Sequence, residues 1–277
     1  MSKKIGFVGL GTMGLSMAVN LQKAGFEVIG YDAFKGSVDR ASAAGITMVA
    51  TLKEVAEQAD EAIISMVRDY AQNMEVIFGE EALLSAQTQD KTIIVMSTLD
   101  PDLMNGLCKK VEAESNFKLI DAAVSGGPMG AKAGTLSIMT SGPEGLVKSF
   151  KPYFEAMGSN IFYFGSEVGN SQTVKLINNS LLGIHMVALA EGFKLGKQYN
   201  LPEDEVLNLL KVSTGDSWVA RNWKDISEWT ADTALSVLLK DLKATYHQGL
   251  KYNVALPFNG LASIDLFNAM GKEKPVE

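Results

Sequence analysis

The sequence predicts an α/β domain at residues 1–165, followed by an all-α domain at residues 166–277. Two observations predict this division. Up to about residue 165, short β-rich runs such as "KIGFVG" and "KTIIVMS" alternate with helical patterns such as "PDLMNGLCKKVEAES". From about Gly169 the strand patterns stop, and only helical patterns follow. Alternation of strands and helices is typical of a mostly parallel sheet that is covered by helices on both faces.

The elements follow from these patterns in chain order. The expected strands are "KIGFVG", "EVIGYD", "EAIISMV", "KTIIVMS", "FKLIDAAV", "LSIMTS" and "NIFYFG". The expected helices between them are "TMGLSMAVNLQKAG", "SVDRASAAG", "LKEVAEQA", "PDLMNGLCKKVEAES" and "PEGLVKSFKPYFEAMG". A single long helix is expected at 171–200, ended by Asn200 and Pro202, and further helices at 203–213, 232–252 and 259–270.

Composition narrows the classes of function. Lys and Arg number 25 against 32 Asp and Glu, a net charge of −7, which argues against a nucleic-acid partner. With Cys108 as the one cysteine, no disulfide within the chain and no Cys-rich zinc site is expected. No His/Asp/Glu cluster has metal-ligand spacing, so no metal is expected either. Glycines interrupt the N-terminal apolar stretch, and the later run "LLGIHMVALA" is too short to span a bilayer. We therefore expect no membrane partner and a cytoplasmic location.

A glycine-rich turn follows the first strand. Gly9, Gly11 and Gly14, with Thr12 and Met13 between them, form the pattern G-x-G-x-x-G between an apolar strand and an amphipathic helix. The first glycine allows a tight turn, the second lets the backbone approach a pyrophosphate, and the third lets helix and strand pack closely. The α/β domain is therefore predicted to be a Rossmann-type dinucleotide-binding domain, in which these five residues bind the cofactor.

Asp32 ends the second strand, eighteen residues after Gly14. A carboxylate at this place binds the adenosine ribose hydroxyls and repels the additional phosphate of NADP. NAD is the expected cofactor and NADP the less expected one, although the nearby Lys35 could soften the preference.

The stretch "TVKLINNS" at 173–180 places Lys175, Asn178 and Asn179 on one face of an otherwise apolar helix. Lysine is rarely buried, but a buried lysine whose pKa is lowered can act as a general acid or base. A snorkelling lysine beside two amides is the alternative interpretation. A second polar segment, "DAAVSGG" at 121–127, has two glycines after a strand. Their N–H groups and the Ser125 hydroxyl could bind an anion, or the segment could be an ordinary turn.

These motifs together resemble the β-hydroxyacid dehydrogenase family. "GFVGLGTMGLSMAVNLQKAG" is similar to its cofactor signature, "DAAVSGG" to its substrate-binding segment, "KLINN" to its catalytic helix, and "KDL" at 240–242 to a later motif. The resemblance implies that Lys175 is the general acid/base and that Asn179 holds the substrate. It also implies that Thr98 touches both cofactor and substrate. The further cofactor residues that it implies are Met66, Val67 and Lys240. The further substrate residues that it implies are Ser125, Gly126, Gly127 and Asp241.

The sequence departs from the family pattern at several places. Ala123 stands where proline is usual, Ser171 where glycine is usual, and Val67-Arg68 where a Leu-Pro pair is usual. None of these removes a proposed catalytic group. The expected function is an oxidoreductase that transfers a hydride between NAD(H) and a small β-hydroxy acid or its semialdehyde. An NADP-preferring reductase of another small carbonyl or imine, and a non-catalytic cofactor-binding module, are the alternatives. The apolar residues between Leu181 and Leu195 exceed one helix face, so a homodimer or homotetramer is expected.

Overall fold

The computed structural model describes residues 3–88 and 90–274 and divides into two compact units, Met1–Lys175 and Leu176–Glu277. The division falls inside helix α9 (Asn170–Gln198), whereas the sequence placed the domain junction at 165/166. The first unit has strands and helices, and the second is helical in its described residues. The predicted fold class, an α/β domain followed by an all-α domain, is confirmed.

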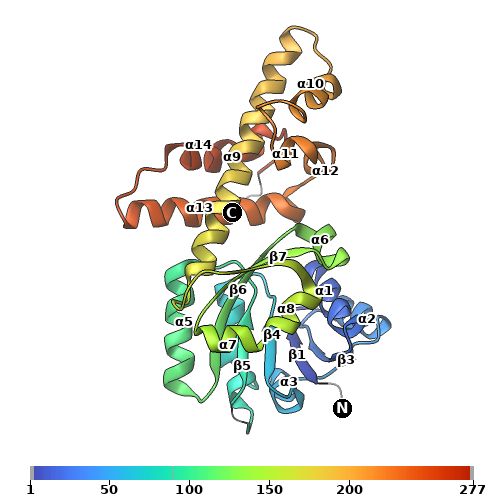
Figure 1. Cartoon of the computed structure of the whole chain (residues 1–277), viewed down its shortest axis with the longest axis vertical. Coiled ribbons are helices and arrows are strands. Elements are labelled where there is room, and N and C mark those ends of the chain that lie inside the picture. Colours follow the sequence, from blue (N-terminus) through green and yellow to red (C-terminus); the bar gives the residue numbers. More distant parts are fainter. Residues whose placement is uncertain (1–2, 89, 275–277) are drawn as a thin grey trace. The chain divides into compact units, whose positions relative to one another are not determined.

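The first unit is built on one eight-stranded sheet with the order β3-β2-β1-β4-β5-β6-β7-β8 (Figure 1). Strands β1 to β6 run parallel, β7 is antiparallel to β6, and β8 is parallel to β7. The strands are β1 (Lys4–Val8), β2 (Glu27–Tyr31), β3 (Thr47–Met48), β4 (Ala62–Ser65), β5 (Thr92–Val95), β6 (Lys118–Ser125), β7 (Leu136–Ser141) and β8 (Gly158–Tyr163). The order 3-2-1-4-5-6 is that of a dinucleotide-binding sheet, and sheets of this type bind their ligands beyond the carboxyl ends of the strands.

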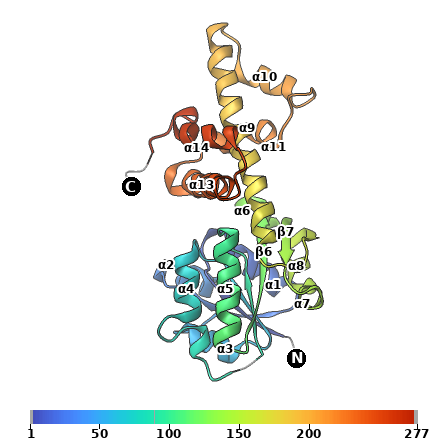
Figure 2. The same ribbon diagram turned by 90° about the vertical axis from the view of Figure 1, so that its left-hand side faces the viewer.

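Helices cover both faces of this sheet, as predicted. One core includes residues of α1 (Thr12–Lys23), α2 (Lys35–Ala43), α6 (Gly127–Ala133), α7 (Glu144–Ser149) and α8 (Lys151–Met157). The other includes residues of α3 (Leu52–Gln58), α4 (Tyr70–Phe78), the 3₁₀ helix η1 (Leu83–Ser85) and α5 (Pro101–Glu114). Figure 2 shows α3 and α5 on one side of the sheet and α7 and α8 on the other.

Lys91 is a buried cation at the amino end of β5. Its ammonium donates to the carbonyl oxygens of Ala59 (2.6 Å) and Asp60 (2.7 Å), and the residue is 8% exposed. These two residues directly follow α3, so the lysine satisfies carbonyl groups at the end of that helix and interacts favourably with its dipole. It lies at the edge of the sheet opposite the carboxyl ends of the parallel strands.

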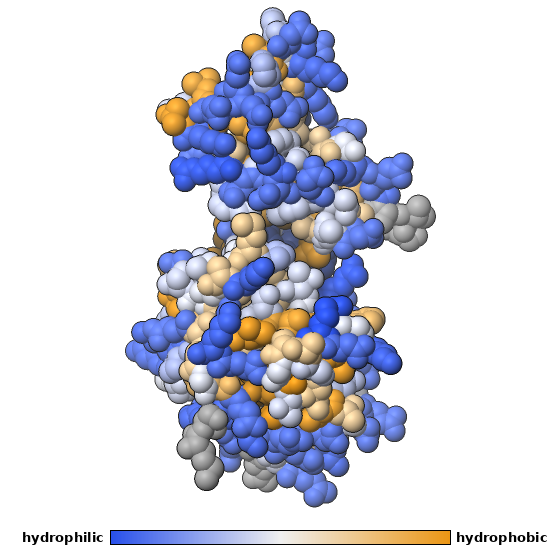
Figure 3. All heavy atoms as spheres, turned by 90° about the vertical axis from the view of Figure 1, so that its right-hand side faces the viewer, coloured by the Kyte–Doolittle hydropathy of each residue, from blue (hydrophilic) through white to orange (hydrophobic). Residues whose placement is uncertain are grey.

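The second unit consists of helices that pack around the C-terminal part of α9. They are α10 (Glu203–Leu210), α11 (Trp218–Arg221), α12 (Trp223–Ser227), the π-helical turn η2 (Ala231–Leu235), α13 (Ser236–Lys251) and α14 (Pro257–Ala269). Met186 and Val187 of α9, Leu242 of α13 and Leu266 of α14 are buried in its core. On the face drawn in Figure 3, polar and apolar side chains are mixed in both units.

Helix α9 has 29 residues and contains the apolar run that begins at Leu181. With a mean hydropathy of 1.2 over its most apolar stretch, it is long and apolar enough to cross a membrane by length and composition. The run beginning at Leu181 is part of this longer apolar helix, so the length of the run by itself does not decide whether the helix could span a bilayer. Core helices of globular proteins meet the same criterion, and Met186, Val187 and Ala190 of α9 pack into the core of the second unit.

Candidate active site

The glycine-rich turn has the geometry that its sequence predicts. Gly9 has φ +89°, and a Cβ atom there would lie 2.6 Å from the carbonyl oxygen of Met66. A Cβ on Gly14 would lie 1.9 Å from the carbonyl oxygen of Gly9, so α1 packs directly against the turn. A Cβ on Gly11 would meet nothing within 4 Å. The close contacts require glycine at positions 9 and 14, and the open space at Gly11 leaves room for a ligand beside the backbone.

This turn fits the pyrophosphate of a dinucleotide. Gly11 is the N-cap residue of α1, and no side chain caps the helix there. The first turn of α1, which includes Thr12 and Met13, contains no acidic residue. N–H groups at a helix N-terminus, together with the positive end of the dipole, attract phosphate groups.

Asp32 lies one residue beyond β2, next to the turn. Its carboxylate accepts hydrogen bonds from the backbone N–H groups of Leu10 (2.7 Å) and Phe34 (2.8 Å). The carboxylate therefore holds the glycine-rich turn against the end of β2. Its position beside the turn agrees with the ribose-binding role predicted for it, and Lys35 lies exposed three residues further on at the start of α2.

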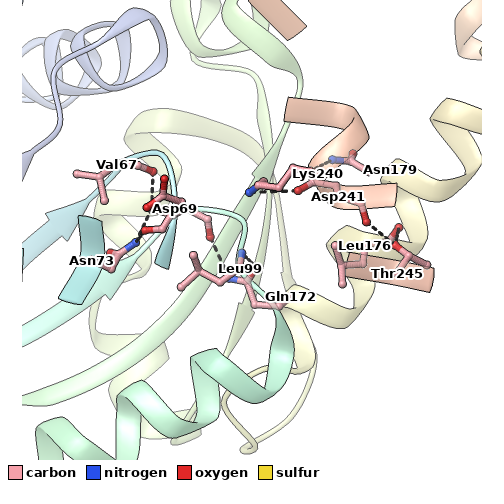
Figure 4. A network of polar contacts seen from close by, with 11 residues as sticks. Val67, Asp69, Asn73, Leu99, Gln172, Leu176, Asn179, Lys240, Asp241 and Thr245 are labelled. Atoms are coloured by element: carbon pink, nitrogen blue, oxygen red, sulfur yellow. Dashed lines mark hydrogen bonds and ion pairs between the residues drawn. The ribbon is translucent and has the colours of Figure 1, made fainter. Parts of the chain in front are cut away.

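Met66, Val67 and Thr98 follow the carboxyl ends of β4 and β5. The Ser97 hydroxyl donates to the carbonyl oxygen of Val67 (2.7 Å) and accepts from the side-chain amide of Asn73 (3.2 Å); Figure 4 labels Val67 and Asn73. Ser97 is buried and Thr98 is half-buried. These hydrogen bonds join the two segments, so that the predicted cofactor residues at this edge of the sheet share one polar framework.

The segment Ser125-Gly126-Gly127 ends β6 and begins α6. Gly126 has φ +132° and Gly127 has φ +61°, and both are exposed. Only glycine adopts two such values in succession without strain, because a Cβ atom disfavours positive φ. The segment therefore presents an exposed, tightly turned backbone at the carboxyl end of β6, which suits the predicted binding of a substrate carboxylate.

Ser171, near the start of α9, joins β6 to β7. The N–H of Ala123 donates to the Ser171 hydroxyl (3.0 Å), which in turn donates to the carbonyl oxygen of Met139. Ala123 and Met139 are paired across the two strands, so the hydroxyl bridges the ladder. Proline at 123 would lack the N–H, and glycine at 171 would lack the hydroxyl. The two departures from the family pattern thus form one contact, which ties the segment at Ala123 to the start of α9.

Asp121 on β6 is fully buried and binds the start of α9. One carboxylate oxygen accepts from the N–H groups of Gly169 and Gln172 and from the Ser141 hydroxyl, each at 3.2 Å. The other oxygen accepts from the Gln172 side chain at 2.6 Å. Burial raises the pKa of Asp121 to about 7, while these hydrogen bonds lower it. The Cys108 thiol, whose pKa is raised to about 11 by burial, is also close enough to feel the Asp121 charge.

The raised pKa of Asp121 makes stability depend on pH in a defined direction. The folded chain binds this proton more tightly than the unfolded chain, whose aspartate has the ordinary value of 3.8. The stabilisation is therefore complete below about pH 4 and is lost as the pH rises through about 7. Relative to Asp121→Asn, the parent should lose up to about 1.4 kcal/mol of unfolding free energy per pH unit across this window. Urea unfolding of both proteins at several pH values measures this, and parallel pH profiles would contradict it.

Lys175 follows Gln172 by three residues in α9. It is buried, and so is Asn179 one turn later, whereas Asn178 is exposed. The sequence placed all three on one polar face, and the structure separates Asn178 from the two buried residues. A lysine buried one turn after the residues that bind Asp121 is unusual for a purely structural helix.

Asn179, Lys240 and Asp241 come together in the second unit. The Asn179 amide donates to the Asp241 carboxylate at 2.6 Å, and the Lys240 ammonium lies 3.2 Å from the same carboxylate (Figure 4). Asp241 is 1% exposed, and its backbone carbonyl accepts from the Thr245 hydroxyl. The "KLINN" and "KDL" motifs therefore contact each other through α9 and α13, as their shared role in the family implies.

Comparisons with known proteins identify the family of the chain. The NAD-binding domain of 6-phosphogluconate dehydrogenase matches residues 4–165, and the NAD-binding domain of NADP-dependent 3-hydroxyisobutyrate dehydrogenase matches residues 169–274. The chain belongs to the β-hydroxyacid dehydrogenase family. One similar member of this family is 2-(hydroxymethyl)glutarate dehydrogenase of Eubacterium barkeri, whose sequence is 33% identical over 95% of this chain and 87% of that protein.

Two further family members show the extent of the similarity. Mitochondrial 3-hydroxyisobutyrate dehydrogenase of Mus musculus is 36% identical over 80% of this chain, which spans 65% of that protein's length. The crystal structure of 3-hydroxyisobutyrate dehydrogenase from Salmonella typhimurium is 27% identical, with a TM-score of 0.86 over 98% of this chain and 95% of that one. The chain thus contains NAD(P)-binding domains of this family, and the roles of individual residues in it stay predictions.

Sequence reasoning missed the polar residues beneath the predicted site. Gln172, Ser97 and Asn73 are buried and hydrogen-bonded to the segments that hold Val67 and Thr98. A glutamine three residues before the predicted catalytic lysine, in a helix that is otherwise largely apolar, was the signal that could have revealed Gln172.

Proposed function

We propose that the chain is an oxidoreductase that transfers a hydride between NAD(H) and a small β-hydroxy acid or its semialdehyde. The observation that carries the proposal is the burial of Lys175 in α9. One turn before it, Gln172 bonds both Leu99, which follows Thr98, and Asp121 on β6. The family supports it, because the relatives compared above are named as dehydrogenases of small hydroxy acids. The presence of Lys175 favours an enzyme over a module that only binds the cofactor.

The residues divide the chemistry as follows. When bound, the nicotinamide supplies or accepts the hydride. The Lys175 amine takes the hydroxyl proton when the alcohol is oxidised, and its ammonium donates a proton to the carbonyl oxygen when the aldehyde is reduced. Ser125, Gly126 and Gly127 bind the substrate carboxylate, and Asn179 bonds the substrate through an amide that Asp241 orients. Lys240 and Thr98 contact the cofactor.

A spectrophotometric screen of the purified protein tests this function. Consumption of NADH and NADPH is followed with three- and four-carbon semialdehydes, keto acids and cyclic imines. The proposal expects turnover of at least one semialdehyde with NADH. Turnover of imines alone would favour the imine-reductase alternative, and no turnover with bound NADH would favour the binding module.

The substrate preference is proposed from the segment 212–223. Trp218 is 55% exposed, while Trp223 packs against Phe193 with ring centroids 5.2 Å apart and belongs to the core. Trp223 is therefore held by packing within the second unit, and Trp218 is the more exposed of the two tryptophans. Ser213 and Thr214 are exposed donors nearby in the chain. The named substrate of the Eubacterium barkeri relative carries a second carboxylate, a polar group besides its hydroxyl and its first carboxylate.

We expect acids with an additional polar substituent to be preferred over branched aliphatic ones. A site that bonds a hydroxyl rejects analogues that lack it more strongly than an apolar site rejects one methylene. The ratio of kcat/KM for tartronate semialdehyde to that for methylmalonate semialdehyde, the aldehyde of 3-hydroxyisobutyrate, should exceed about 10. Trp218→Ala should relax the limit on substrate length. A ratio near one would mean that the segment is structural.

A homodimer or homotetramer is proposed from the surface of the second unit. Most of the exposed large apolar side chains of the described chain belong to it, including Phe258, Leu261 and Ile264 of α14, which are 64–83% exposed. Their spacing of three residues places them on one helix face, where a second copy could cover them. Light scattering at micromolar concentration should show an oligomer that Ile264→Asp weakens and that Leu103→Asp, a control on α5, does not. A monomeric parent would refute it.

We also propose that NAD is the preferred cofactor, because the Asp32 carboxylate lies beside the glycine-rich turn. We also propose a cytoplasmic location, because a chain whose one cysteine is buried and unpaired is typical of proteins from a reducing compartment.

A further inference from the structure

The Gln172 side chain brackets Thr98 on both sides. Its carbonyl oxygen accepts from the N–H of Leu99 (2.8 Å), and its amide nitrogen donates to the carbonyl oxygen of Ser97 (3.0 Å). The same nitrogen donates to the Asp121 carboxylate (2.6 Å). Gln172 is fully buried, and Figure 4 shows its side chain directed at Leu99. The two peptide groups that flank Thr98 are therefore both held by one side chain.

The hydrogen bonds continue beyond Gln172 into the neighbouring loop. Ser97, whose carbonyl binds Gln172, donates through its hydroxyl to Val67 (2.7 Å). Asn73 binds that hydroxyl (3.2 Å) and accepts from Ser65 on β4 (2.8 Å). One network thus links β6, the start of α9 and the segments after β5 and β4. Buried networks of this kind fix a single geometry, because each unmade bond costs the desolvation of its polar group.

We propose that Gln172 is a positioning residue that holds Thr98, through its two flanking peptide groups, in register with Lys175 on the next turn of α9. This inference rests on the proposed function, in which Thr98 touches cofactor and substrate and Lys175 transfers the proton. Gln172 itself touches neither. Its contribution is to fix the distance between two predicted site segments that are far apart in the sequence, and small displacements of reacting groups lower rates strongly.

Two variants of Gln172 and one control separate positioning from simple stabilisation. Gln172→Glu is isosteric and retains an acceptor for Leu99, but it loses the donor to Ser97 and places a second carboxylate beside Asp121. Gln172→Met removes the side-chain hydrogen bonds to Leu99, Ser97 and Asp121 without adding charge. It replaces Gln172→Glu in the measurements if that variant does not fold. Lys91→Met is the control, because it removes hydrogen bonds to the carbonyl groups of Ala59 and Asp60 at the opposite edge of the sheet.

Three quantities are measured at a temperature where all proteins are folded. They are kcat with NADH and the best semialdehyde, the Kd for NADH, and hydrogen exchange of the peptide that contains Leu99. We expect the Gln172 variants to show faster exchange at Leu99 and a kcat lowered by about 10-fold or more. The primary isotope effect on kcat with deuterated NADH should increase. Lys91→Met should lower the melting temperature while leaving kcat and exchange at Leu99 near the parent values.

The outcomes decide between the two roles. Faster exchange at Leu99 with kcat within about two-fold of the parent would show that Gln172 only stabilises the fold. Unchanged exchange at Leu99 would show that Gln172 does not hold the peptide groups on either side of Thr98. If the parent turns over no substrate, the proposed function fails separately. The inference is then decided by NADH binding, which the Gln172 variants should weaken more than Lys91→Met does; equal Kd values would overturn it.

Discussion

Replacing Lys175 by alanine is expected to lower kcat by about 10²-fold or more, the usual scale for the loss of a general acid/base. The Kd for NADH should change little, because the predicted cofactor residues of the glycine-rich turn and of the ends of β2, β4 and β5 remain. Lys175→Arg should be similarly inactive, since arginine retains its proton at neutral pH and cannot act as the base.

The matched control for this variant is Lys197→Ala. Lys197 is an exposed lysine in the last turn of the same helix, so its removal tests the loss of a cation from α9 without touching the predicted site. Its kcat should equal that of the parent. A Lys175→Ala protein that keeps kcat within a few-fold of the parent would remove Lys175 from the mechanism.

The parent is expected to prefer NADH to NADPH by about 10²-fold in kcat/KM, because like charges brought together at a binding site cost several kcal/mol. In the proposed binding mode, the Asp32 carboxylate is the group that would meet the additional phosphate of NADPH. Asp32→Asn should reduce the preference by about tenfold or more, mainly through better use of NADPH.

The choice of asparagine follows from the structure. Asp32 also accepts from the N–H groups of Leu10 and Phe34, and the amide oxygen of an asparagine side chain at this position can still accept one of these bonds. Asp32→Ser removes the charge and loosens the turn together, so it should weaken both cofactors. Lys35→Ala should increase the preference for NADH if this lysine attracts the phosphate. A parent that already prefers NADPH would refute the role of Asp32 and make Lys35 the residue to study.

Much of the fold was predictable because its main elements carry strong periodic patterns. The apolar strands β1, β4 and β5 and the long helix α9 lie where the sequence places them. The two-residue strand β3 is too short to show alternation, and α6 contains two glycines, which disfavour helices. The single helix predicted at 143–158 is divided into α7 and α8 at Phe150, a break that Pro152 in the first turn of α8 marks and that the prediction overlooked.

The site was predictable only where local sequence dictates geometry. The glycine-rich turn and the positive φ values at Gly126 and Gly127 follow from residue type, because few other residues adopt such conformations. The contacts of Gln172 with Ser97 and Asp121 join residues 75 and 51 positions apart. Such pairings depend on the strand order of the sheet, which no local pattern in one sequence specifies. The bridge between Ala123 and Ser171 was hidden for the same reason.

Chemical rescue of Lys175→Ala by small amines tests the central claim most directly. NADH consumption with the best semialdehyde is measured for the parent and for the variant across a series of primary amines of increasing basicity. The account predicts that the parent is active, that the variant is nearly inactive, and that added amine restores turnover in proportion to its concentration and in an order set by its pKa. A variant that keeps the parent rate without amine would contradict the assignment of Lys175 as the proton-transferring group.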